Sequence, residues 1–207
     1  MVRGVVVSLT PAQRVQRALY LVGRAAIDTL DPDVRKAGAP PMCPDGFYLL
    51  KDHNGGKDPT APDPFDRWRK PGKTFENRTA DCIGGAAWIG GFDRYQPTRF
   101  AHIYSGWINT DSMSQDAKGP AKCFEAIDSP EPGSFVVCVS GSRGHAVGHI
   151  GTVVEVPAEW DPTVRECWNA LGVVDVAART PQKANQMTTG RGWFNTGALF
   201  VRSIMQP

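Results

Sequence analysis

Four short apolar runs in the second half of the chain constrain the fold more than any other feature. Each is rich in valine, isoleucine or phenylalanine and is bounded by glycine, proline or polar residues, and the runs read FVVCVS, HIGTVVEVP, GVVDVAA and ALFVRSI. Runs of this length and composition are typical of buried β-strands. The helix signals precede them along the chain. We therefore expect an α+β fold, with helices first and then about four strands joined in a way that allows antiparallel pairing.

A helix is predicted near the N-terminus. Thr10-Pro11 is a helix start, with threonine as N-cap and proline in the first turn. An apolar stripe then continues until Asp31-Pro32 ends the helix, and its members are Val15, Leu19, Val22, Ala26 and Leu30. Residues 100–117 are expected to form a helix or loop followed by polar turns, and SPEPGS (129–134) is expected to form a turn.

No domain boundary is evident in the 207 residues. We expect one domain that consists of an N-terminal helical segment (1–36), a loop-rich segment (37–75) and a catalytic core (76–207). The middle segment is rich in proline, glycine and aspartate, which favours an ordered but irregular path.

Charge and cysteine content exclude several function classes. The net charge of +2 is too small for a dedicated nucleic-acid binder. The five cysteines are odd in number and contain no CxxC pair, which argues against a zinc ribbon or a fully paired disulfide framework and favours free thiols. No stretch is long and apolar enough to span a bilayer, and a signal peptide is not apparent. We expect synthesis in the cytosol and no membrane insertion.

Cys82 stands out in the stretch TADCIGGAAWIGG (79–91). A helix N-terminus carries unpaired N–H groups and a partial positive charge, both of which favour a thiolate. Gly84 and Gly85 weaken a helix by about 1 kcal/mol each, which a chain tolerates where a partner must approach closely. One interpretation is therefore a nucleophile at the start of a helix. The other is a small core residue, because cysteine is among the most buried residue types.

His149 is the best candidate for a base that would activate this thiol. It begins a predicted strand directly after a glycine-containing loop, so its ring can project from a rigid edge. The other three histidines have less favourable contexts: His145 in the loop itself, His102 among apolar residues, and His53 in a polar turn.

Asp175 is the candidate for a third group that orients the imidazole. A carboxylate flanked by valines is costly unless it accepts hydrogen bonds or pairs with a charge. If the strands of His149 and Asp175 are neighbours, the carboxylate can face the ring. Glu155 and Asn195 are the competitors, and an aspartate on an edge strand that faces water is the alternative.

Taken in order, DCIGGAAW, PGSFVVCVS and GHIGTVVEV resemble the papain-like cell-wall cysteine peptidases of the NlpC type and the related CHAP amidohydrolases. The upstream stretch FYLLKDHNGGKDPTAPDPFD is similar to the segment that precedes the cysteine in phage-borne members. Ile83 departs from the pattern, because the family has serine there. The resemblance implies a papain-like domain in which the nucleophile helix packs on an antiparallel sheet of about four to six strands.

The resemblance also implies roles for individual residues. Cys82 would be the nucleophile, His149 the general base and Asp175 the orienting residue. Tyr48 and Asp81 would lie at the substrate and oxyanion side of the site, and the backbone N–H of Cys82 would contribute to the oxyanion hole. No cofactor or metal is implied. The acidic loop with Asp58, Asp63 and Asp66 does not have the spacing of a 12-residue calcium loop.

The activity that the resemblance implies is hydrolysis of an amide bond in peptidoglycan, in a stem peptide or between sugar and peptide. The protein would act as a monomer on the bacterial cell wall, as a phage endolysin or as an injected antibacterial effector. Trp68, Trp88, Trp107 and Trp193 could offer aromatic surface to glycan, although tryptophans are usually core residues. The alternatives are a papain-like enzyme with another amide substrate, an inert binding or structural protein, and a zinc amidase, for which no HExxH motif is present.

Overall fold

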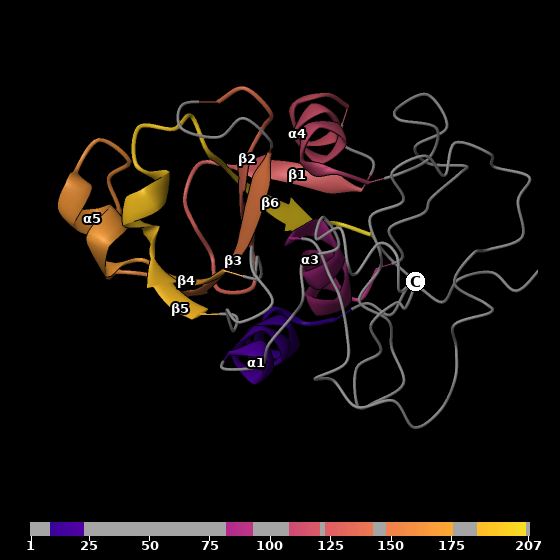
Figure 1. Ribbon diagram of the computed structural model, residues 1–207, viewed down its shortest axis with the longest axis horizontal. Helices are drawn as coiled ribbons and strands as arrows, with labels where there is room; N and C mark the ends of the chain where they lie inside the picture. The colour runs from indigo at the N-terminus through magenta and orange to yellow at the C-terminus, as the bar shows by residue number, and fades with distance from the viewer. Residues whose placement is uncertain are drawn as a thin grey trace, which may run out of the picture.

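The computed structural model describes residues 9–22, 82–92, 108–120, 123–142, 148–175 and 186–205. Six strands within these ranges form one sheet in the order β1-β6-β2-β3-β4-β5 (Figure 1). Every neighbouring pair is antiparallel. The strands are β1 (Phe124–Ile127), β2 (Phe135–Cys138), β3 (His149–Glu155), β4 (Gly172–Asp175), β5 (Gln186–Thr189) and β6 (Leu199–Ser203). The expectation of an α+β fold with an antiparallel sheet is confirmed. The four predicted strands are β2, β3, β4 and β6, and the two strands that were not predicted are β1 and β5.

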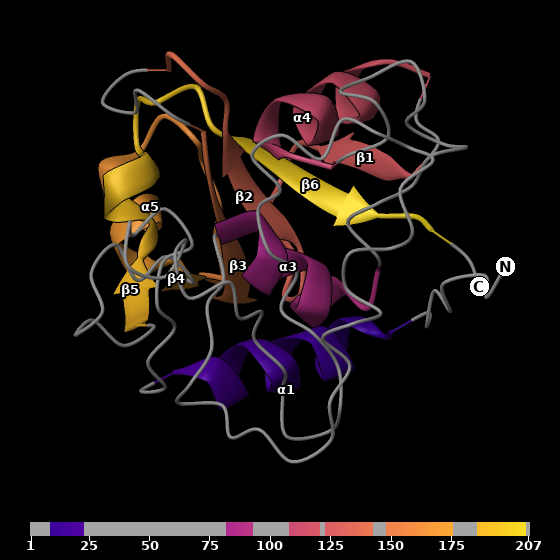
Figure 2. The same ribbon diagram turned by 45° about the vertical axis from the view of Figure 1, so that its right-hand side comes forward.

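Helices cover both faces of the sheet (Figure 2). The described helices are α1 (Pro11–Leu21), α3 (Cys82–Gly90), α4 (Thr110–Lys118), α5 (Arg165–Ala170) and the 3-10 helix η4 (Gly190–Trp193). Buried residues of α1, α3 and α4 join one apolar cluster, here called the first core. Trp168 of α5 and Trp193 of η4 join another, here called the second core. The sheet separates the two cores.

The strand period explains this separation. Along β2, Phe135 and Val137 belong to the first core, whereas Val136 and Cys138 belong to the second. Successive side chains of a strand point to opposite faces. All four residues of β2 are buried, as expected for an interior strand that is covered on both sides.

The start of α1 is as predicted. The Thr10 hydroxyl accepts a hydrogen bond from the Gln13 backbone N–H at 3.2 Å, and the Gln13 side chain accepts one from the Thr10 N–H at 2.9 Å. This is a capping box, which satisfies two of the free N–H groups of the first turn. Gly133, with φ of +83°, lies so close to α1 that a β-carbon there would be 2.7 Å from the Pro11 carbonyl oxygen.

The predicted apolar stripe of this helix is wrong at Leu19, whereas Val22 packs against the first core and Ala26 and Leu30 lie outside the described residues. The buried residues are Arg14, Ala18 and Leu21, while Leu19 is 48% exposed. The helix ends at Leu21, and Val22 already has extended backbone, so the described part does not continue toward Leu30. The buried set has the same helical spacing as the predicted stripe but begins one residue earlier. Packing against the sheet therefore selected a face on which the stem of an arginine replaces a valine.

The C-terminal end of α3 lies at the pair Gly90-Gly91. Gly91 has φ of +71°, and the N–H of Phe92 donates to the carbonyl of Ala87 at 3.1 Å, which is a glycine-dependent helix stop. Ile83, Ala86, Ala87 and Ile89 are buried in the first core. Thr79 and Asp81, whose side chains could cap the helix N-terminus, lie outside the described residues.

Helix α4 corrects the prediction of polar turns before residue 118. Asn109 forms a capping box with Ser112, in which its side chain accepts the Ser112 N–H at 2.7 Å. Met113 is fully buried. The buried carboxylate of Asp116 accepts the N–H groups of Cys123 and Phe124 at 3.1 and 2.9 Å. The polar residues that resembled turn residues are caps and acceptors that connect the helix to β1.

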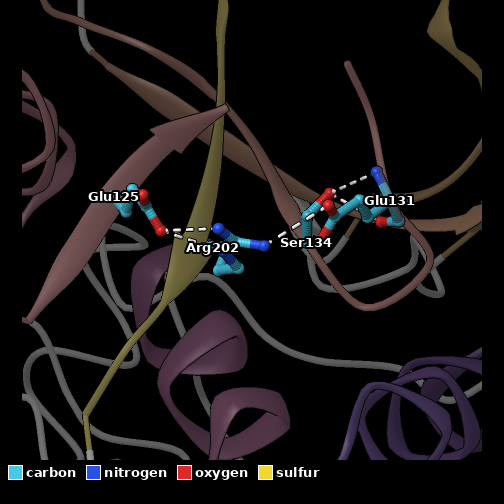
Figure 3. Close-up of polar contacts among 4 residues, drawn as sticks. All are labelled: Glu125, Glu131, Ser134 and Arg202. Atoms are coloured by element: carbon cyan, nitrogen blue, oxygen red, sulfur yellow. Dashed lines mark hydrogen bonds and ion pairs between the residues drawn. The ribbon is translucent and has the colours of Figure 1, made fainter. Parts of the chain in front are cut away.

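An ion pair joins edge strand β1 to β6 (Figure 3). The Arg202 guanidinium donates to Glu125 Oε2 from Nη2 at 2.7 Å and from Nε at 3.0 Å, and it contacts Glu131 at 3.4 Å. Glu131 in turn accepts the Ser134 hydroxyl with its backbone carbonyl at 2.6 Å. These side chains are about half exposed, and exposed pairs contribute roughly 0–1 kcal/mol. Their main effect is to fix the turn before β2.

Candidate functional site

His149 and Asp175 lie together. His149 is the first residue of β3, and Asp175, the last of β4, is registered with Gly151. Residues two apart on a strand share a face, so the imidazole and the carboxylate are diagonal neighbours on one side of the sheet. The His149 Nε2 atom is 3.0 Å from Asp175 Oδ1. The condition stated from the sequence, that these two strands be neighbours, is met, and the carboxylate lies beside the ring.

The pairing determines which ring nitrogen carries the proton. A carboxylate only accepts hydrogen bonds, so Nε2 of the neutral ring must be the N–H that donates to Asp175. The lone pair is then on Nδ1. An imidazole in this tautomer can accept a proton at Nδ1 while the carboxylate stabilises the resulting positive charge.

The two competitors of Asp175 are placed elsewhere. Glu155 is exposed at the far end of β3 from His149, and Asn195 is exposed in the turn after η4. Asn195 also has φ of +60°, a left-handed conformation that asparagine tolerates in turns. The acid that the structure places beside the His149 ring is therefore Asp175.

Trp193 covers the imidazole. The rings of His149 and Trp193 are stacked, with centroids 5.2 Å apart and planes inclined by only 6°. Gly151 leaves room for the indole, because a β-carbon there would be 3.2 Å from Trp193 Cζ2 and 2.6 Å from Val173 Cγ1. His149 is consequently only 6% exposed, although it is the terminal residue of its strand.

Helix α4 contacts Ser140 and Gly148, the second of which directly precedes His149. The carboxylate of Asp111 accepts the N–H of Ser140 at 2.8 Å, and the Ser140 hydroxyl accepts the N–H of Gly148 at 3.3 Å. Gly148 itself lies against the side chain of Thr110, where a β-carbon would overlap the hydroxyl. The backbone position of His149 is thus set from the N-terminus of α4.

Cys82 begins α3, as predicted, and its side chain is partly exposed beside the first core. Helix α3 packs against β3. The other end of α3 lies at the start of β2, where a β-carbon on Gly90 would be 3.2 Å from the Phe135 ring. The opposite end of β2 is where Cys138 pairs with His149.

The two candidate groups belong to different faces of the sheet. Cys82 packs with the first core, whereas His149 stacks on Trp193 of the second. Because His149 is the first residue of β3, a thiol on one face and an imidazole on the other can meet only around the end of that strand. The structure brings His149 and Asp175 together, and it places Cys82 on the helix that covers the same strand.

Cys138 is the cysteine registered with His149 on the same face. Its thiol is fully buried and lies 3.1 Å from the Thr196 hydroxyl. Burial raises the pKa of the Cys138 thiol, and hydrogen bonds with Thr196 and Ser142 only partly oppose that effect. A buried thiol with a raised pKa is a poor nucleophile. Cys138 is therefore a structural neighbour of the site, and the more exposed Cys82 is the better candidate nucleophile.

Other predicted residues lie outside the described residues. These are Tyr48 and Asp81, the acidic loop of Asp58, Asp63 and Asp66, and the histidines at 53, 102 and 145. Among the residues that the structure describes, no cluster of histidine, cysteine, aspartate or glutamate could hold a metal ion. Within the same residues, no helix is long and apolar enough to cross a membrane.

Trp193 was one of the tryptophans with two interpretations, a glycan surface or the more usual core residue, and its cover over the imidazole was not predicted. Trp193 is 5% exposed, so it offers no open aromatic surface. The available signal was Gly151, two residues after His149, since glycine inside a strand often marks the close approach of another group.

Comparisons with protein-family models, with curated proteins and with solved structures find no match to this chain. The site is therefore interpreted from its own geometry.

Proposed function

We propose that the protein is a cysteine-dependent amide hydrolase of the papain-like type that acts on peptidoglycan. The observation that carries the catalytic part is the His149–Asp175 hydrogen bond of 3.0 Å, formed by two residues that the motif order had assigned to base and orienting group. Cys82 at the first residue of α3 supports the same assignment. The substrate and the cell-wall setting, including the phage endolysin role, rest on the sequence resemblance.

The proposed reaction has two steps. The Cys82 thiol gives its proton to Nδ1 of His149, and the thiolate attacks the amide carbonyl carbon. The tetrahedral intermediate collapses, the C–N bond breaks, and the imidazolium delivers its proton to the leaving amine. Water, deprotonated by His149, then attacks the thioester, which releases the carboxylic acid and regenerates the thiol. Backbone N–H groups at the start of α3 would stabilise the oxyanion.

This mechanism requires Cys82 and His149 to meet around the end of β3. A thiol within reach of such a base is activated even before substrate binds, so Cys82 should be reactive in the free protein. We expect iodoacetamide to modify Cys82 in the native protein faster than it modifies Cys167, which is also partly exposed. Peptide mapping after limited alkylation gives both rates in one sample. Equal and slow reaction of the two thiols would contradict the mechanism.

The decisive experiment uses Cys82→Ser on purified peptidoglycan sacculi, with Cys167→Ser as the matched control. Wild type and the control should release the same fragments, and the Cys82 variant should be inactive. Mass analysis of the fragments identifies the bond that is cut. Equal activity of the two variants would exclude the thiol mechanism. Inactivity of the wild type on sacculi, with activity on simple amides, would exclude only the proposed substrate.

A non-catalytic binding or structural protein is the second candidate. The observation that favours it is the assignment of Cys82 and His149 to opposite faces of the sheet. This candidate predicts that the protein sediments with sacculi without releasing fragments, and that Cys82→Ser sediments equally well.

A further inference from the structure

We propose that Trp193 is a positioning residue that, together with Asp175, fixes the orientation of the His149 ring; its catalytic consequence rests on the proposed function. A histidine side chain turns about two bonds, so one hydrogen bond does not determine its orientation. The near-parallel stack on Trp193, inclined by 6°, restricts the imidazole to one plane. Two ring orientations, related by a half-turn, remain in that plane. The hydrogen bond to Asp175 is available in only one of them.

Trp193 is itself held in place by contacts with the same part of the sheet. The hydroxyl of Thr196 donates to the Trp193 carbonyl at 2.6 Å and also lies 3.1 Å from the Cys138 sulfur. Cys138 is registered with His149 on β2. The indole and the imidazole are therefore both positioned by contacts with one strand pair, β2 and β3. This explains why a buried threonine–cysteine contact is found beside the site.

Coverage by the indole also affects the strength of the His149–Asp175 bond. The indole lies over one face of the imidazole and His149 is 6% exposed, so little water competes for the ring. A hydrogen bond to a charged group is stronger where water is excluded. A positively charged imidazolium, formed when His149 accepts the thiol proton, would in addition lie over the electron-rich face of the indole.

Side-chain NMR tests this inference without relying on catalysis. Long-range ¹H–¹⁵N spectra report the tautomer of each of the four histidines, and His149→Gln assigns the His149 signals. We expect a single Nε2–H tautomer in the wild type. Trp193→Ala should give averaged nitrogen shifts that indicate both tautomers, and Trp193→Phe should retain most of the Nε2–H form. A single Nε2–H tautomer in Trp193→Ala would overturn the proposal.

Trp168→Phe is the matched control. Trp168 is as buried as Trp193, at 5% exposed, and belongs to the same second core, but its ring packs against Trp160, Phe194 and Phe200. It should destabilise the fold without changing the His149 tautomer. Should Trp193→Ala not fold, Thr196→Val takes its place, with a smaller shift expected in the same direction. A change of tautomer in Trp168→Phe equal to that in the Trp193 variants would also overturn the proposal.

The rate of Cys82 alkylation tests this proposal and the proposed function separately. If both hold, Trp193→Ala should slow alkylation of Cys82 by about tenfold at neutral pH, within the usual contribution of a positioned base. If the tautomer of His149 changes in Trp193→Ala but wild-type Cys82 reacts no faster than Cys167, the positioning role holds and the thiol mechanism fails.

Discussion

Gly148 lies directly against the Thr110 side chain, so that a β-carbon on Gly148 would overlap the threonine hydroxyl. This contact joins the residue before His149 to the first residue of α4. The position of the proposed base therefore depends on a helix that contributes no group to the reaction itself.

Gly148→Ala should shift His149 and lower both activity and stability. Overpacking of a tight contact typically costs about 1–3 kcal/mol, which urea unfolding would measure. Thr110→Ala in the same chain removes the nearest atom and should restore part of the loss. Additive effects of the two changes would show that the contact does not couple the two residues.

Replacement of Asp175 should affect turnover more than binding. Asp175→Asn keeps an oxygen that can accept the Nε2 hydrogen bond but loses the charge, so we expect a fall in kcat of about tenfold, and Asp175→Ala should lose about a hundredfold. KM should change little, because Asp175 acts through His149. Glu155→Gln, a change at an exposed residue of β3, is the control. An unchanged kcat in Asp175→Ala would rule out the orienting role.

The buried hydroxyl of Thr152 has no hydrogen-bond partner among the described residues. Thr152→Val keeps the shape and removes an unsatisfied polar group, which should stabilise the protein by about 1 kcal/mol. Thr188 offers the opposite case, because its hydroxyl donates to the Val173 carbonyl at 3.1 Å. Thr188→Val should destabilise by about 1 kcal/mol. Thermal and urea unfolding of the two variants would show whether the signs differ.

Stability should fall at alkaline pH, in part because of Cys138. Burial raises the pKa of its thiol, so the folded state retains a proton that the unfolded chain releases near pH 8.5. The contribution is full below that pH and is lost as the pH rises through the folded pKa. Cys138→Ala should show a shallower fall in the free energy of unfolding between pH 8 and 10. An identical slope in both proteins would contradict the assignment.

The sequence predicted the elements that have strong local signals. The strands β2, β3, β4 and β6 and the cap of α1 followed from apolar runs and from Thr10-Pro11, because strand period and helix capping depend on neighbouring residues. The pairing of His149 with Asp175 was stated as a condition on strand order, and the register satisfies it.

Other features depended on contacts that sequence patterns do not record. The buried face of α1 was misassigned because packing against the turn at Gly133 and the sheet selected Arg14 over Val15. α4 was read as polar turns because Asn109 and Asp116 have the composition of a loop, yet their side chains bond backbone N–H groups in the fold. The stacking of Trp193 on His149 depends on the packing of η4 against β3, which lies far from it in the sequence.

The place of β6 between β1 and β2 has a consequence for how the molecule is made. Strand β6 is the last of the six to be synthesised. The earlier strands β1 and β2 both pair with β6, so neither can form that pairing until β6 is available. Non-local pairing of this kind slows folding. Strand β1 and the β6-facing edge of β2 should therefore complete their pairing only after residue 203 has been synthesised.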